Sequence, residues 1–170
     1  MVTIILPGFS VYNKEWLEET AKKIKVGGEI RPIYWEHWTD PNKEFDVREK
    51  GRLINNVAGI RVTDIIAKSI GTLTASYMIL KSPEKINKVI FNGIPLNDLS
   101  ESEKEVIKSA LRLIPRKNFI CFQNEADPHA SFNQVNSFLS EIGEKINLVR
   151  KNREDHEYFF VDDFNKFLSN

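Results

Sequence analysis

The sequence has few of the features that mark secreted or membrane proteins. It contains a single cysteine, Cys121, which cannot form an internal disulfide and lies in the apolar run Asn118–Phe122, so we expect a buried strand residue. No apolar run is long enough to cross a bilayer, and Met1 leads directly into a short apolar run with no basic stretch. These features predict a cytoplasmic protein that does not contact membranes.

Net charge and metal-binding motifs are also absent. The 24 lysines and arginines balance the 24 aspartates and glutamates, so no overall field would attract a polyanion, and nucleic acid is not expected as a partner. No cluster has the spacing of zinc ligands and no loop is rich in metal-binding carboxylates, so neither a metal nor another cofactor is expected. The sequence leaves the oligomeric state open.

No feature divides the chain into parts. It lacks internal repeats, low-complexity tracts and linkers rich in proline, glycine or serine. A length of 170 residues suits one domain with a substantial core. We therefore expect a single domain over residues 1–170, with one functional site.

Short apolar and β-branched runs recur at intervals typical of strands. Six runs are predicted as strands: Val2–Leu6, Glu29–Tyr34, Asp64–Lys68, Lys88–Phe91, Asn118–Phe122 and Ile146–Val149. Helical patterns between them predict right-handed crossovers and hence an α/β three-layer sandwich. Its six-stranded, mostly parallel sheet would have the strand order 2-1-3-4-5-6, with helices on both faces. Catalytic residues should follow strands, because ligands of such sheets bind at the carboxyl ends of the strands.

Local signals predict where several helices begin. Asn13 is a possible cap for the first helix. Ser100 with Glu103, and Ser131 with Gln134, stand at capping-box spacing at the start of two later helices.

Two helices have weaker boundaries. The last helix is predicted over Tyr158–Leu168 because its aromatic residues recur at helical spacing. The sequence 36–50 is polar and irregular, and only Leu53, Ile54 and Val57 suggest a helix after it.

A candidate nucleophile, Ser69, lies at the end of the third predicted strand, in the sequence Ala67-Lys68-Ser69-Ile70-Gly71. A serine on a tight turn from strand to helix has a strained backbone that projects its hydroxyl from the sheet edge. The residues two before and two after this serine nearly touch and must be small, as Ala67 and Gly71 are. The following helix would direct its N-terminal amide, that of Ile70, toward a developing oxyanion.

This turn resembles the nucleophile elbow of the α/β-hydrolase family, Gly-x-Ser-x-Gly, with alanine in place of the first glycine. Asn124-Glu125-Ala126-Asp127-Pro128 resembles the acid loop of that family, and Asp155-His156-Glu157 resembles its histidine loop. The resemblance covers nearly the whole chain. It implies a small, compact serine hydrolase without a large cap domain, in which Ser69 is the nucleophile, His156 the base and Asp127 the residue that orients the base.

The loop after the first strand completes the resemblance. Leu6-Pro7-Gly8-Phe9 is similar to the oxyanion loop of the family, which implies that the backbone amides of Phe9 and Ile70 form the oxyanion hole, although Pro7 replaces the usual histidine. Gly8, Tyr12, Trp35 and Trp38 are candidates for a substrate pocket. For these aromatic residues, ordinary packing is an equally good interpretation.

Other residues compete for the catalytic roles. Asp98 follows the fourth strand, a position from which some α/β hydrolases supply the acid, but the loop of Asp127 is shorter and more direct. His37 lies in a polar stretch, and His129 follows Asp127 so closely that we do not expect it to face Ser69. We expect His129 to line the entrance or to be solvated.

The favoured function is that of a carboxylesterase-like enzyme that cleaves an ester, thioester or amide bond of a small-molecule acyl substrate. A catalytically idle protein of the same fold that binds a partner is the alternative. A flavodoxin-like binding domain is disfavoured because Pro7-Gly8-Phe9-Ser10 is a poor phosphate-binding loop.

Overall fold

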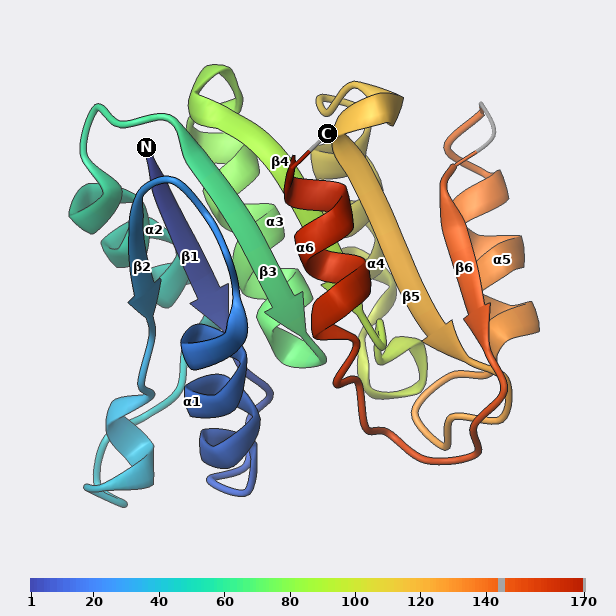
Figure 1. The fold of residues 1–170 in the computed structure, drawn as a ribbon. Helices are drawn as coiled ribbons and strands as arrows, with labels where there is room; N and C mark the ends of the chain where they lie inside the picture. The colour runs from blue at the N-terminus through green and yellow to red at the C-terminus, as the bar shows by residue number, and fades with distance from the viewer. Residues whose placement is uncertain (144–145, 170) are drawn as a thin grey trace.

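Six parallel strands form the centre of the molecule. The computed structural model describes residues 1–143 and 146–169. The strands are β1 (Val2–Leu6), β2 (Glu29–Pro32), β3 (Thr63–Lys68), β4 (Ile86–Asn92), β5 (Phe119–Asn124) and β6 (Leu148–Lys151), in the order β2-β1-β3-β4-β5-β6 (Figure 1). The predicted strand order is confirmed, and all neighbouring strands are parallel rather than mostly so.

The strand order determines which loops are neighbours. β1 pairs with β2 on one side and with β3 on the other, so the order of strands reverses between β1 and β3. In register, Leu6 lies opposite Ala67, and Lys68 lies opposite Asn92. The loops after β1, β3 and β4 therefore border the crevice where open α/β sheets bind ligands.

The helices cover both faces of the sheet. They are α1 (Asn13–Lys23), α2 (Val47–Ala58), α3 (Ile70–Lys81), α4 (Glu101–Leu111), α5 (Phe132–Ser140) and α6 (Val161–Ser169). Buried side chains of α1 and α6 pack on one face, and those of α2 to α5 pack on the other (Figure 1). The predicted three-layer sandwich is thus confirmed. None of the helices described is both long and apolar enough to cross a membrane.

Burial explains the composition of individual strands. β1 is buried along its whole length, so its sequence VTIIL is almost entirely apolar. The edge strands β2 and β6 are partly exposed and carry charged residues, which discourage pairing with another chain. Cys121 in β5 is fully buried, as predicted.

Capping boxes explain where α4 and α5 begin, whereas α1 begins at a backbone turn. Both predicted capping boxes are present, Ser100 with Glu103 and Ser131 with Gln134. The predicted cap at Asn13 is wrong, because Asn13 is the first residue of α1 and its amide side chain donates to the Ser10 carbonyl over 3.0 Å. A backbone turn, with the Asn13 N–H also donating to Ser10, leads the chain into the helix instead.

Two helix boundaries differ from the sequence prediction. α2 begins inside the stretch expected to be irregular, because Asp46 caps it and accepts two backbone N–H groups. Ile54 faces the core, whereas Leu53 and Val57 are exposed. α6 begins only at Val161, because the carbonyl of Tyr158 accepts the Trp16 indole N–H over 2.6 Å instead of a helical N–H.

Gly71 allows the start of α3 to pack against the end of β1. A Cβ atom at this position would lie 2.5 Å from the carbonyl oxygen of Leu6 and 2.8 Å from that of Pro7. The requirement for a small residue is confirmed, but the atoms closest to Gly71 belong to the end of β1 and not to Ala67. The close approach brings the loop after β1 next to the turn at Ser69.

We predict that Gly71→Ala lowers the free energy of unfolding by about 1–3 kcal/mol, because the added methyl group collides with backbone atoms that cannot rotate away. Urea unfolding of the wild-type chain and the variant measures the difference. Gly27→Ala is the control, because a Cβ atom at Gly27 meets no atom within 4 Å. Equal stability of the wild-type and Gly71→Ala chains would contradict the close packing of α3 against β1.

Candidate active site

Ser69 occupies the tight turn between β3 and α3. Its φ of 55° and ψ of −127° make it the one non-glycine residue with a positive φ in the described part of the chain. Its backbone N–H donates to the Asn92 carbonyl over 2.9 Å, and its carbonyl accepts the N–H of Thr72 over 2.8 Å. Residues other than glycine adopt such a conformation only where the surroundings enforce it, and such strain clusters at functional sites.

Asp127 and His156 form a hydrogen-bonded pair beside this turn. His156 Nδ1 and Asp127 Oδ2 are 2.6 Å apart, and the Asp127 side chain is fully buried. The same carboxylate oxygen accepts the hydroxyl of Tyr158, and Oδ1 accepts the backbone N–H of His129 over 2.8 Å. These donors come from two different loops, which the carboxylate therefore holds together.

The hydrogen bonds keep Asp127 ionised despite its burial. Burial by itself raises the pKa of Asp127, but the hydrogen bonds from His156 and Tyr158 outweigh it, and the net shift is downward. Burial also raises the pKa of Tyr158, and the neighbouring Asp127 raises it further, so the phenol stays protonated and donates. A buried carboxylate that accepts the Nδ1 proton fixes the ring tautomer and leaves the lone pair on Nε2.

The second ring nitrogen of His156, Nε2, is available to accept a proton. This atom is buried and has no hydrogen-bond partner among the residues that the structure describes. The ring lies over Gly93, where a Cβ atom would be 2.9 Å from His156 Cε1 and 2.4 Å from a ring carbon of Tyr158. Gly93 follows Asn92, the residue that holds the Ser69 backbone, so Ser69 and His156 contact consecutive residues at the end of β4.

The side chains of Ser69 and His156 are not hydrogen-bonded to each other in this structure, within residues 1–143 and 146–169. Bonds of this kind are often long or misaligned before a substrate binds. The structure therefore brings the predicted nucleophile and base to the same strand end without joining them.

The predicted oxyanion loop lies against the start of α3. Among the described residues, no hydrogen-bond acceptor is found for the backbone N–H of Phe9 or of Ile70. The Phe9 carbonyl accepts Trp38 Nε1 over 2.7 Å and lies 2.8 Å from His37 Nε2. Two side chains from the segment after β2 thus hold the loop that carries Phe9.

Of the four residues proposed for the substrate pocket, Gly8 and Trp35 are buried in the structure. Trp35 is only 1% exposed and belongs to the core, where its indole N–H donates to the Gly8 carbonyl over 3.0 Å. Trp38 donates to the loop through its indole N–H, and Tyr12 is 88% exposed. Packing, the second interpretation of these aromatic residues, is correct for Trp35.

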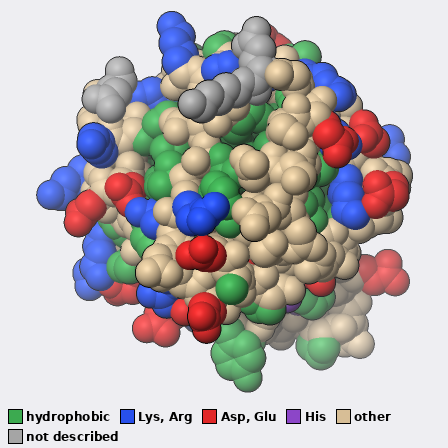
Figure 2. Space-filling model, turned by 90° about the vertical axis from the view of Figure 1, so that its right-hand side faces the viewer, with side chains coloured by type: hydrophobic (Ala, Val, Ile, Leu, Met, Phe, Trp, Pro, Cys, Tyr) green, Lys and Arg blue, Asp and Glu red, His purple; other side chains and the backbone are tan. Residues whose placement is uncertain are grey.

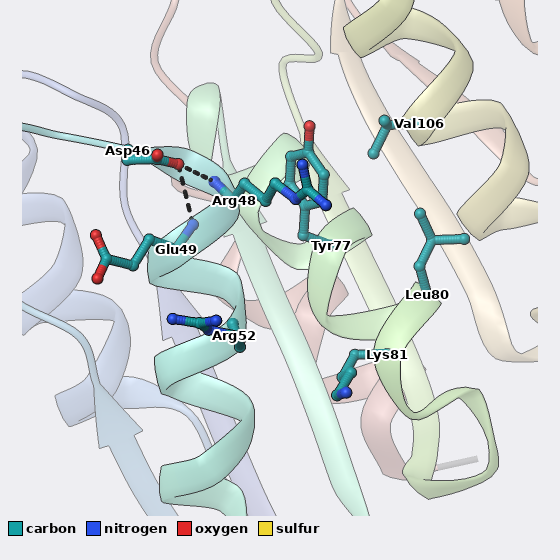
Figure 3. A pocket seen from close by; sticks show the side chains of 8 residues that line it. All are labelled: Asp46, Arg48, Glu49, Arg52, Tyr77, Leu80, Lys81 and Val106. Atoms are coloured by element: carbon teal, nitrogen blue, oxygen red, sulfur yellow. Dashed lines mark hydrogen bonds between the residues drawn. The ribbon is translucent and has the colours of Figure 1, made fainter.

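Two surface grooves lie apart from the three candidate catalytic residues. One, of about 370 Å³, is bordered by Tyr12, Trp16, Glu157 and Phe159. Another, of about 830 Å³, lies between α2 and α3 and is lined in part by Arg48, Arg52 and Lys81 (Figure 3). Neither contains Ser69, Asp127 or His156.

A second pair of histidine and aspartate adjoins the first. His129 Nδ1 lies 2.5 Å from Asp98 Oδ2, and the His129 ring centroid lies 4.3 Å from that of His156. Asp98, the rival acid, therefore contacts His129 and not His156. His129 is partly exposed, as expected, and its ring contacts that of the predicted base at an interplanar angle of 51°.

Tyr158 and Gly93 are parts of the site that were not predicted from the sequence. The assignment of Tyr158 to a helix concealed its role, although a tyrosine two residues after a candidate base can reach the same partner in an extended chain. A glycine directly after a buried strand was the available signal for Gly93, because glycine permits close approach and a positive φ.

We predict that Tyr158→Phe lowers the free energy of unfolding more at neutral pH than at acidic pH. A carboxyl with a lowered pKa adds stability above its unfolded-state pKa of about 4, and this is lost as pH falls through the folded-state value. Loss of the Tyr158 hydroxyl raises the pKa of Asp127, so the free energy of unfolding should fall by about 1.5–3 kcal/mol at pH 7 and by less below about pH 4.

Urea unfolding between about pH 3 and pH 7 checks this pH dependence. Tyr34→Phe is the control, because the Tyr34 hydroxyl is exposed and lies 3.4 Å from Glu18. Superimposable curves for wild type and Tyr158→Phe would contradict the role given to the phenol.

Comparison with known proteins identifies the fold. No family model and no curated protein sequence matches the chain. Several solved structures do, over 99% of its length. An α/β serine hydrolase without a lid from Xanthomonas campestris has a TM-score of 0.68 and 16% identity, with 78% of that chain covered.

Two more matches have related activities in their names. A monoacylglycerol lipase from Paleococcus ferrophilus has a TM-score of 0.68 and 12% identity, with 94% of that chain covered. A carboxylesterase from Bacillus cereus has a TM-score of 0.62 and 12% identity, with 87% covered. The chain therefore has the α/β-hydrolase fold, as the resemblance implied.

Proposed function

We propose that this protein is a serine hydrolase that cleaves ester, thioester or amide bonds through an acyl-enzyme on Ser69. One observation carries the proposal. A buried, ionised Asp127 binds Nδ1 of His156, whose free Nε2 is buried at the strand end that also holds the strained residue Ser69. This arrangement supplies a base of defined tautomer next to a hydroxyl.

The chemical steps follow from these roles. Nε2 of His156 takes the Ser69 proton while Oγ forms a bond to the substrate carbonyl carbon, and Asp127 stabilises the imidazolium. The imidazolium then gives this proton to the leaving group as the tetrahedral intermediate collapses to the acyl-enzyme. A water molecule, deprotonated by the same nitrogen, attacks the acyl-enzyme and releases Ser69 and the acid.

The oxyanion of the intermediate needs donors that do not reorganise. The unbonded amides of Phe9 and Ile70 are suited to this, because Gly71 lets their two segments pack together. Loss of one such donor typically costs about 100- to 1,000-fold in turnover. Backbone donors persist when side chains are replaced, so these two positions act through the main chain.

The surroundings of the site favour an acyl substrate with an apolar part. Phe9, Val11 and Tyr12, in the loop after β1, are 47–88% exposed. Hydrophobic side chains project at the lower edge of the molecule, the end to which the strands run (Figure 2). The lipase and the carboxylesterase among the similar structures are consistent with such a substrate.

The second candidate function is that of a catalytically idle protein that binds a partner. The missing hydrogen bond between Ser69 and His156 favours it. In that case the strained turn would have no chemical role, and its serine would not react with a probe directed at activated hydroxyl groups.

We predict that a fluorophosphonate probe labels the wild-type chain at Ser69 and does not label Ser69→Ala. The probe reacts only with a serine whose proton is removed by a base, so His156→Gln should also abolish labelling. Mass spectrometry of the labelled peptide identifies the modified residue. Ser10→Ala, in the nearby loop, is the control that should remain labelled; an unlabelled wild-type chain would favour the idle protein.

We predict that Asp127→Asn lowers the kcat for a small ester by about 1,000- to 10,000-fold, because the amide stabilises the wrong tautomer of His156. Asp98→Asn should change kcat far less, because Asp98 contacts His129. Steady-state hydrolysis of a nitrophenyl ester measures both effects. The reverse ranking would transfer the role of the acid to Asp98.

A further inference from the structure

A buried lysine directly precedes Ser69. Lys68 is only 2% exposed, and its Nζ atom lies 2.9 Å from Oε2 of Glu157, the residue that directly follows His156. The ammonium group also lies 5.7 Å from the centre of the Trp16 ring. The ion pair therefore joins the two segments that carry the proposed nucleophile and base.

Among the described residues, no other hydrogen bond or ion pair makes this connection between residues 67–71 and 153–158. The histidine loop is otherwise held by Asn124 to Asp155, by Asp127 to His156, and by Trp16 to Tyr158. None of these three contacts includes a residue of the segment 67–71.

The ion pair between Lys68 and Glu157 is expected to contribute little to the stability of the fold. Burial lowers the pKa of Lys68, and the Glu157 carboxylate opposes that shift, so removing this amine from water carries a cost in desolvation. Because the Glu157 side chain is 65% exposed, water screens the pair, and ion pairs open to water typically add only weakly to stability. Buried ionic groups are retained in some proteins because they select one arrangement of the chain.

We propose that Lys68 and Glu157 are positioning residues that set the separation of Ser69 Oγ and His156 Nε2. The inference rests on the proposed function, because it assigns that separation a catalytic role. Each member of the pair is one residue away from a reacting side chain, so a shift of one segment against the other alters the gap directly. A misplacement of about 1 Å costs about 100-fold in rate.

The test compares Lys68→Met, Glu157→Gln and the double variant with a matched control. Lys108 in α4 is also a buried lysine, paired with Glu105 and Glu141 and 5.1 Å from the centre of the Phe138 ring. It lies on the other face of the sheet and contacts no residue of the site. Lys108→Met thus removes a similar ion pair without touching either catalytic segment.

Each single substitution at the pair should lower kcat by about 10- to 100-fold and leave KM within about twofold. The double variant should be no slower than the slower single variant, because either change breaks the same link. Lys108→Met should keep kcat within about twofold, whatever its melting temperature. A kcat of Lys68→Met equal to that of wild type would overturn the proposal, even with a lower melting temperature.

A measurement independent of turnover separates this inference from the proposed function. The ring resonances of His156 in NMR spectra, assigned with His156→Gln, should shift in both single variants and stay unchanged in Lys108→Met. Glu157→Gln alters a side chain that is 65% exposed, so it leaves the core intact. Unshifted His156 resonances in both single variants would overturn the positioning role, whether or not the wild-type chain reacts with the fluorophosphonate probe.

Discussion

The ionised carboxylate of Asp127 is the constraint on which the candidate site depends. A charge buried without partners would cost several kcal/mol, so the chain must supply donors to it. The donors are the His156 ring, the Tyr158 hydroxyl and the His129 amide, from the loops after β5 and β6. By satisfying Asp127, the chain also orients the ring that would act as the base.

The parallel sheet makes this convergence possible. Because all six strands run in the same direction, the loops after β1, β3, β4, β5 and β6 meet at one end of the molecule. Two glycines allow close packing there. Because they lack a side chain, the end of β1 packs against Gly71, and the rings of His156 and Tyr158 pack against Gly93. Close packing at Gly71 brings the loop after β1 next to the turn at Ser69, and close packing at Gly93 brings His156 to the end of β4.

Two histidine–aspartate pairs of similar geometry stand side by side in the site. The rings of His129 and His156 are in contact, yet each is bound by a different aspartate. Burial separates their roles: the Asp127 side chain is fully buried, whereas those of Asp98 and His129 are about half exposed. A buried pair keeps its geometry and its ionisation, which is what orientation of a base requires.

The sequence by itself determined that there are six strands, their order, both capping boxes and the order of the candidate site residues, because these depend on local patterns or on a family resemblance. It did not determine the bounds of β2, β4, β5 and β6, which differ from the predicted ones by two residues at one or both ends. Only the tertiary structure decided between Asp127 and Asp98 as the partner of His156, and it alone showed that Trp35 is buried and that Lys68 reaches Glu157. These partners are 27 to 89 residues apart. Local preferences act over a few residues, so the partner of a side chain becomes defined only when the packed sheet brings distant loops together.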